Sequence, residues 1–145
     1  MDDFYDEALM VAKTFNVETK PDRLVIYSVS YQPTKKNKQL ALEFIKENPD
    51  YQMLDLTPCG IKMIDMGLDT EHPRLNSEEV NFLWRTASRR FIESASGNVT
   101  AFVDNADERS VFLGMELPTL LANEKITTVN GIDKHTFAKQ FDRRF

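Results

Sequence analysis

Hydrophobic positions in the first third of the chain follow two spacings, one typical of helices and one typical of strands. Apolar residues recur at helical spacing over residues 4–15, which predicts an amphipathic helix that ends near Asn16. Residues 24–31 are rich in β-branched and aromatic side chains and predict a strand. The helical spacing returns from residue 40 and is closed by Asn48-Pro49, because proline does not continue a helix.

The middle of the chain predicts one short strand and one long helix. Residues 52–56 are interpreted as a strand, residues 57–60 as a turn, and residues 61–66 as a short helix. After a polar loop over residues 67–76, Asn76 or Ser77 is placed to cap a helix, with Glu79 in capping-box position. That helix buries a stripe of apolar residues and ends before a glycine: Val80, Leu83, Trp84, Ala87 and Phe91, then Gly97.

The last third predicts two more strands and a closing helix. Residues 99–103 are mostly apolar, as expected of a strand that is covered on both faces. Residues 116–121 form a short connection that is either helical or extended. A strand over residues 126–129 is followed by a turn and by a helix that begins at Thr136.

Strands that alternate with helices predict an α/β fold class, with a small and mostly parallel central sheet flanked by helices and an N-terminal helical part. The length of 145 residues is typical of a single domain, here residues 1–145. Ligands of such sheets bind beyond the carboxyl ends of the strands. We therefore expect a site among the loops that follow Tyr31, Leu56 and Val103.

Composition excludes several classes of function. A net charge of -5 disfavours nucleic acid as a partner, and no apolar run has the length of a signal peptide or a membrane span. Cys59 is the only cysteine, so no internal disulfide forms, and with His72 and His135 it gives no zinc spacing. The five glycines form no phosphate-binding loop. We therefore expect no metal and no bound cofactor.

Four residues are candidates for chemistry, although each has an ordinary alternative interpretation. Trp84, the only tryptophan, lies on the apolar stripe of its helix, and Ser88 follows it by four residues on the same face. Taken alone, Trp84 is typical of a core and Ser88 of a surface. Glu116 lies among apolar residues and must face solvent, be paired, or have a raised pKa. Asp55 either points to water from its predicted strand or is functional; two such carboxylates are typical of glycosidic chemistry.

The arrangement of these residues resembles the ADP-ribosyl cyclase and NAD glycohydrolase family, known from animal ectoenzymes and bacterial toxin domains. The run from Trp84 to Ser88-Arg89-Arg90-Phe91 is similar to the helix with the family's active-site Trp and Ser. The pattern Ser110-x-Phe112-x-x-x-Glu116 looks like the segment that ends in its catalytic glutamate. The resemblance spans roughly residues 40–117 and puts Asp55 where the family has a second acidic residue. It departs from the animal enzymes, which are longer and rich in disulfides.

The resemblance implies a role for each candidate. Glu116 would be catalytic, stabilising an oxocarbenium-like ribose, and Asp55 would hold the carboxamide of the leaving nicotinamide. Trp84 would stack on the nicotinamide ring, and Ser88 would contact the ribose or its phosphate. Three further residues are expected to contact substrate: Ser110, Phe112 and Tyr31. A second aromatic of the family aligns near Thr34, so Tyr31 is the candidate to replace it.

The function implied is cleavage of the nicotinamide–ribose bond of NAD(P), which releases ADP-ribose and some cyclic ADP-ribose. The resemblance also suggests a bacterial toxin domain, delivered as part of a larger secreted protein into the reducing cytoplasm of a target cell. Its expected partner is a cognate immunity protein. The alternative is a catalytically inactive module that binds a nucleotide or a protein on the same fold.

Overall fold

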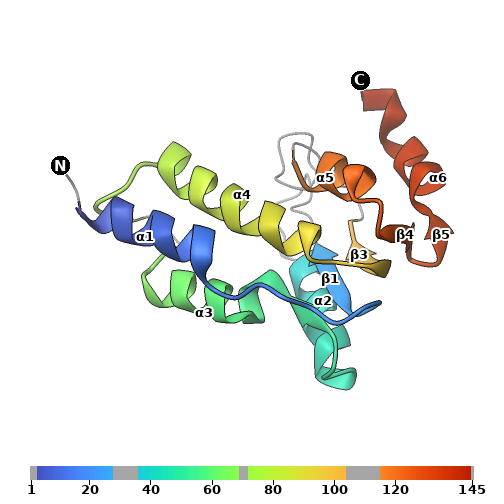
Figure 1. The fold of residues 1–145 in the computed structure, drawn as a ribbon, viewed down its shortest axis with the longest axis horizontal. Helices are drawn as coiled ribbons and strands as arrows, with labels where there is room; N and C mark the ends of the chain where they lie inside the picture. Colours follow the sequence, from blue (N-terminus) through green and yellow to red (C-terminus); the bar gives the residue numbers. More distant parts are fainter. Residues whose placement is uncertain (1–2, 28–35, 69–71, 104–114, 145) are drawn as a thin grey trace.

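A computed structural model describes residues 3–27, 36–68, 72–103 and 115–144 of the chain. Within these ranges the strands form one five-stranded sheet in the order β2-β1-β3-β4-β5 (Figure 1). The pairs β2-β1, β1-β3 and β3-β4 are parallel, and only the pair β4-β5 is antiparallel. The prediction of an α/β fold with a mostly parallel sheet is confirmed. The strands are β1 (Leu24–Tyr27), β2 (Gln52–Met53), β3 (Gly97–Phe102), β4 (Ile126–Val129) and β5 (Ile132–Asp133).

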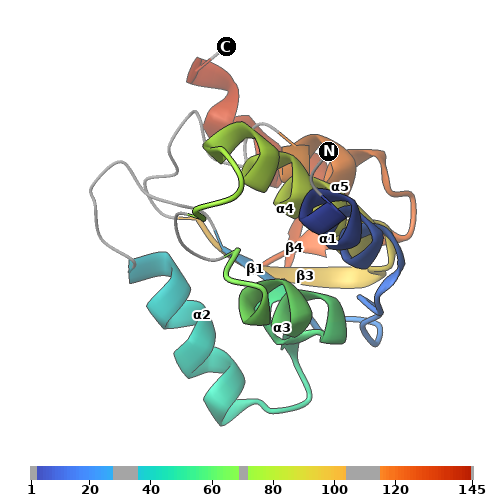
Figure 2. The same cartoon turned by 90° about the vertical axis from the view of Figure 1, so that its left-hand side faces the viewer.

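Helices cover both faces of this sheet and separate its hydrophobic core into two parts. Alternate residues of β1 point to opposite faces, so Leu24 and Ile26 join a large core with α1, α3, α4 and α5, whereas Val25 packs against α2. The helices α1 and α4 lie side by side, and α2 stands apart from them (Figure 2). The helices are α1 (Asp3–Thr14), α2 (Lys36–Glu47), α3 (Pro58–Asp65), α4 (Ser77–Glu93), α5 (Leu117–Ala122) and α6 (Lys134–Ala138).

The long helix α4 begins at the predicted capping box. The side chain of Asn76 accepts a hydrogen bond from the backbone N–H of Glu79 at 2.8 Å. In return, the side chain of Glu79 accepts a hydrogen bond from the backbone N–H of Asn76 at 3.0 Å. Two of the N–H groups at this helix end are thus satisfied reciprocally. Leu83, Ala87 and Phe91 of the predicted apolar stripe are buried in the large core.

A basic residue inside the same helix joins α4 to α1. The Arg90 guanidinium donates to the carbonyl oxygens of Ala12 at 2.7 Å and Phe15 at 2.8 Å. These carbonyls belong to the C-terminal end of α1, where the helix itself offers no donors and a positive charge is favoured. Arg90 is therefore a structural residue of the helical layer.

Three predicted boundaries are wrong. The strand over residues 52–56 ends at Met53, and the chain continues as a 3-10 helix, η1 (Leu54–Leu56). Residues 57–60 are the N-cap and first turn of α3, because the Thr57 hydroxyl accepts from the backbone N–H of Gly60 at 3.0 Å. The last helix begins at Lys134 rather than Thr136, with the Asp133 carboxylate as its cap, and is followed by the 3-10 helix η3 (Lys139–Arg144).

Candidate active site

Ser88 and Glu116 meet inside the protein although 28 residues separate them. Ser88 lies on the buried side of α4, and Glu116 directly precedes α5, which packs on α4. The Ser88 hydroxyl donates to Oε2 of Glu116. Ser88 is 2% exposed and Glu116 is 9% exposed, so the interpretation of Ser88 as a surface serine is wrong. Of the alternatives for Glu116, the structure shows a carboxyl that is buried and hydrogen-bonded.

Burial changes the acidity of Glu116. Removal from water disfavours the charged form and raises the pKa of Glu116 to about 7. The hydrogen bond from Ser88 acts in the opposite direction, and the charge of Asp55 adds to the rise. The carboxyl of Glu116 therefore exchanges its proton near neutral pH, the range in which a group serves acid–base chemistry best.

Asp55 belongs to the same electrostatic environment and is held by two donors. The Tyr27 hydroxyl donates to Oδ2 of Asp55 at 3.0 Å, and the Lys38 ammonium lies 3.5 Å from the same oxygen. The side chain of Asp55 is 14% exposed. The alternative in which Asp55 simply points to water is wrong, because the chain leaves the strand at Leu54 and the alternation on which it rested does not continue.

Tyr27 is a residue of this site that the sequence patterns did not single out. It is the last residue of β1, so it lies at the carboxyl end of a central strand, where ligands of parallel sheets bind. Burial, followed by the charge of Asp55, raises the pKa of Tyr27 well above its usual value. Tyr27 therefore stays protonated and remains a donor. The predicted strand over residues 24–31 places Tyr27 in its middle, so the sequence pattern does not indicate that Tyr27 ends a strand.

Trp84 combines a core position with a fixed orientation. Its ring is half-buried and packs on the large core, and its indole N–H donates to the Leu68 carbonyl oxygen at 2.8 Å. It lies one helical turn before Ser88 on α4. The core interpretation of Trp84 thus holds in part, since the ring is not fully enclosed. Three other predicted contact residues, Tyr31, Ser110 and Phe112, lie outside the described residues, as does Thr34.

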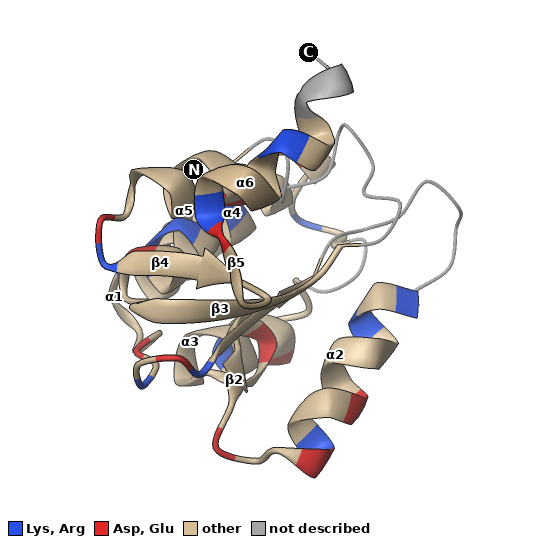
Figure 3. Cartoon of the chain, turned by 90° about the vertical axis from the view of Figure 1, so that its right-hand side faces the viewer, with Lys and Arg blue, Asp and Glu red and all other residues tan. Residues whose placement is uncertain are grey.

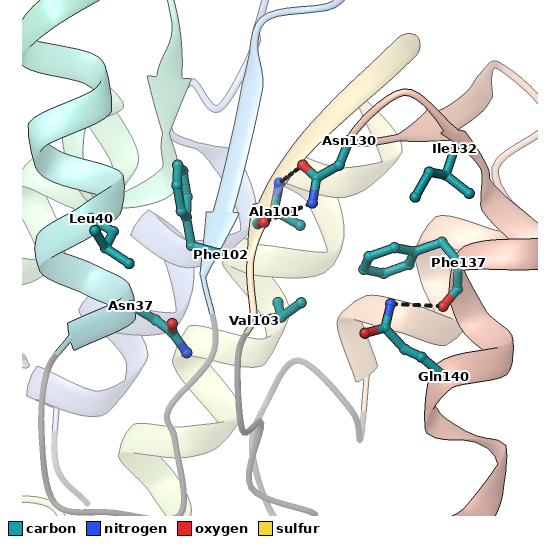
Figure 4. Close-up of a pocket in the computed structure, with 9 residues that line it drawn as sticks. All are labelled: Asn37, Leu40, Ala101, Phe102, Val103, Asn130, Ile132, Phe137 and Gln140. Carbon is teal, nitrogen blue, oxygen red and sulfur yellow. Dashed lines mark hydrogen bonds between the residues drawn. The ribbon is translucent and has the colours of Figure 1, made fainter.

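A separate cavity of about 240 Å³ lies between α2 and α6, against the end of β3 (Figure 4). Its floor is partly closed by the Asn130 carboxamide, which accepts from the Ala101 N–H at 2.8 Å and donates to the Ala101 carbonyl at 3.0 Å. Of the predicted site residues that the structure describes, Asp55, Trp84, Ser88 and Glu116 do not line it. The lining residues are Asn37, Leu40, Ala101, Phe102, Val103, Asn130, Ile132, Phe137 and Gln140.

Among the residues that the structure describes, no three His, Cys, Asp or Glu side chains gather closely enough to bind a metal ion. Within residues 3–27, 36–68, 72–103 and 115–144, every helix is too short or too polar to traverse a lipid bilayer.

Comparison with known proteins identifies the fold. No protein-family model matches the sequence, and no curated protein matches it either. Among solved structures, a mutant of ADP-ribosyl cyclase is 15% identical with a TM-score of 0.56, over 86% of this chain and 61% of that one. Porcine CD38 with a covalent intermediate is 17% identical with a TM-score of 0.56, over 97% of this chain and 80% of that one. Aplysia cyclase, complexed with substrate NGD and product cGDPR, is 14% identical with a TM-score of 0.55, over 97% and 73%.

The chain therefore has the ADP-ribosyl cyclase-like fold, as the sequence resemblance implied. The solved structures that share it are ADP-ribosyl cyclases and CD38, which are similar in fold at low sequence identity. The chain spans about three fifths of the length of the cyclase mutant.

Proposed function

We propose that this protein cleaves the bond between nicotinamide and ribose in NAD, releasing nicotinamide and ADP-ribose, with some cyclic ADP-ribose. The observation that carries the proposal is the buried contact between Ser88 and Glu116, which places a carboxyl with a pKa of about 7 beside an apolar helix face. The shared fold supports it, because a solved structure with this fold holds the dinucleotide NGD as its substrate.

Glu116 acts on the ribose next to nicotinamide. When the C–N bond breaks, its electron pair stays on the pyridine nitrogen, and the ribose ring becomes an oxocarbenium-like cation. The Glu116 carboxylate accepts hydrogen bonds from the ribose hydroxyls and stabilises that positive charge in a site from which water is largely excluded. Water then adds to the cation and loses a proton, giving ADP-ribose. Attack by the adenine of the same molecule gives cyclic ADP-ribose instead.

Two other residues bind the leaving nicotinamide, and a third orients Glu116. Trp84 stacks on the cationic nicotinamide ring, for which the π face of an indole is a favourable partner. Asp55 accepts from the carboxamide of nicotinamide, and Ser88 fixes the orientation of Glu116. In this proposal NAD is the substrate and not a cofactor.

The test is release of nicotinamide from NAD by purified protein, with Glu116→Gln as the inactive variant. Glutamine keeps the size and the hydrogen bond of the side chain but removes its charge, so we expect a loss of roughly 100-fold or more in kcat. Glu124→Gln is the matched control, because Glu124 is exposed. A wild-type protein that binds NAD without releasing nicotinamide would instead favour the inactive binding module.

We further propose that the protein acts as an NAD-depleting toxin domain in the cytoplasm of a target cell, and that an immunity protein protects the producing cell. The support is the single cysteine, which is buried and free, so that folding needs no oxidising compartment. Induced expression in a bacterial cytoplasm should deplete NAD and arrest growth, and Glu116→Gln should abolish both effects. Normal NAD levels with active wild-type enzyme would contradict the toxin role alone.

A further inference from the structure

Two residues outside the predicted site converge on a single oxygen of Asp55. The Tyr27 hydroxyl and the Lys38 ammonium both approach Oδ2, at 3.0 Å and 3.5 Å. A carboxylate offers two oxygens with about four lone pairs between them. Neither of these two contacts uses Oδ1. Among the residues that the structure describes, the protein contacts of Asp55 are thus made through Oδ2, and Oδ1 is the oxygen considered for a ligand.

The topology explains why these three side chains meet. In a β-α-β unit the helix runs back along the sheet, so its first turn lies near the carboxyl ends of the strands. Here α2 connects β1 to β2, and its first turn contains Lys36 and Lys38. Figure 3 shows basic residues, in blue, at this end of α2. Tyr27 ends β1 and Asp55 follows β2, which pairs with β1 in parallel. The contact with Asp55 therefore joins both strands and the helix of this unit.

The two donors differ in character and complement each other. Tyr27 is half-buried and stays protonated, since burial and the neighbouring Asp55 raise its pKa. Lys38 supplies a charge, and its side chain is 33% exposed. A neutral donor with short reach restricts the position of Oδ2, whereas an ammonium group compensates the charge of a carboxylate that is only 14% exposed.

We propose that Tyr27 and Lys38 are positioning residues that hold Oδ2 of Asp55, so that Oδ1 accepts an N–H of the nicotinamide carboxamide. This inference rests on the proposed function. The hydrogen bond to the carboxamide is present both before and during bond cleavage, because the carboxamide does not react. Loss of the positioning contacts should therefore raise KM and leave kcat nearly unchanged, in contrast to changes at Glu116.

The experiment compares two substrates on a set of variants. NAD has the carboxamide N–H group, and 3-acetylpyridine adenine dinucleotide has a methyl group in its place. For Tyr27→Phe and Lys38→Met we expect KM for NAD to rise about tenfold, with kcat within about threefold of wild type. KM for the acetylpyridine substrate should change by less than about twofold, since no N–H contact exists to be lost. Lys38→Arg should restore KM for NAD, and Lys46→Met, at the exposed other end of α2, should match wild type.

The outcomes separate this inference from the proposed function. Equal changes in KM for both substrates, or no change for either, overturn the positioning role while the glycohydrolase activity stands. A wild-type protein that releases the base from neither substrate overturns both. Thermal unfolding of each variant identifies general loss of structure, which affects both substrates alike and does not produce a difference between them.

Discussion

Because Glu116 is buried, the free energy of unfolding should depend on pH, whether or not substrate is present. Below pH 4.5 the Glu116 carboxyl is protonated in the folded and the unfolded chain. Between pH 4.5 and about 7 the folded protein keeps a proton that the unfolded chain has already lost. The contribution of Glu116 to stability is therefore most favourable at low pH, and it is lost as the pH rises through this window. Glu116→Gln removes the titration and keeps a neutral side chain of similar size.

The magnitude follows from the pKa. A rise from 4.5 to about 7 corresponds to about 3 kcal/mol, at roughly 1.4 kcal/mol for each pH unit. We expect Glu116→Gln to have nearly the stability of wild type at pH 4.5, and to be more stable than wild type by about 3 kcal/mol at pH 8. A stabilising substitution of this kind is typical of a group that is retained for activity rather than for folding.

The assay is urea unfolding of wild type and variant at pH 4.5, 6 and 8, with the free energy of unfolding obtained by linear extrapolation. Other titrating groups affect both proteins equally, so only the difference between wild type and variant is interpreted. Glu124→Gln should show no pH-dependent difference, because Glu124 is exposed. The same difference at all three pH values for Glu116→Gln would refute the raised pKa, and with it the buried, proton-exchanging carboxyl.

Three further predictions concern single substitutions, and the last of them has a matched control. Ser88→Ala removes the hydrogen bond that lowers the pKa of Glu116, so the acid limb of the kcat/KM profile should move to higher pH. Asp55→Asn removes the charge that raises this pKa, so in a variant that retains measurable activity the same limb should move to lower pH. Arg90→Met removes the two hydrogen bonds to the carbonyl oxygens at the end of α1 and should lower the free energy of unfolding by about 2–3 kcal/mol. The control Arg89→Met, at an exposed position, should change the free energy of unfolding by less than about 0.5 kcal/mol. Chemical denaturation tests the last pair.

The sequence predicted those elements whose signals are local. The capping box of Asn76 and Glu79 and the apolar stripe that follows it are contained within a few turns of one helix, and the structure has both. The strand at residues 126–129 was likewise found, because a run of β-forming residues is followed by the turn at Asn130-Gly131. The mostly parallel sheet then follows from the alternation of strands and helices.

The environment of Asp55 was not predictable from spacing, because close contacts among residues 54–60 interrupt the strand. The Thr57 hydroxyl donates to the Leu54 carbonyl at 2.7 Å, and that carbonyl lies so close to Gly60 that any side chain there would collide with it. These contacts favour the 3-10 turn that carries Asp55 beside Tyr27. Periodicity, which assumes a regular element, gives no indication of them.

The burial of Ser88 has a similar explanation. A serine on an amphipathic helix is usually assigned to the polar side, since nothing nearby in the sequence satisfies its hydroxyl. Here the acceptor is Glu116, which directly precedes α5, and α5 packs on α4. Each of these two residues is explained by the other: Glu116 provides an acceptor that makes a buried hydroxyl favourable, and Ser88 provides a donor to a buried carboxyl.

The two carboxyl groups of the site are chemically different because their surroundings differ. Among the described residues, the Ser88 hydroxyl is the neutral donor to Glu116, and burial disfavours the charged form, so the proton of Glu116 is exchanged near neutral pH. Asp55 has a phenol and an ammonium group, so its negative charge is compensated by a neighbour of opposite sign. That fixed charge in turn contributes to the raised pKa of Glu116. One carboxyl is thus suited to hold a neutral donor group of a ligand, and the other to respond to a charge that develops during reaction.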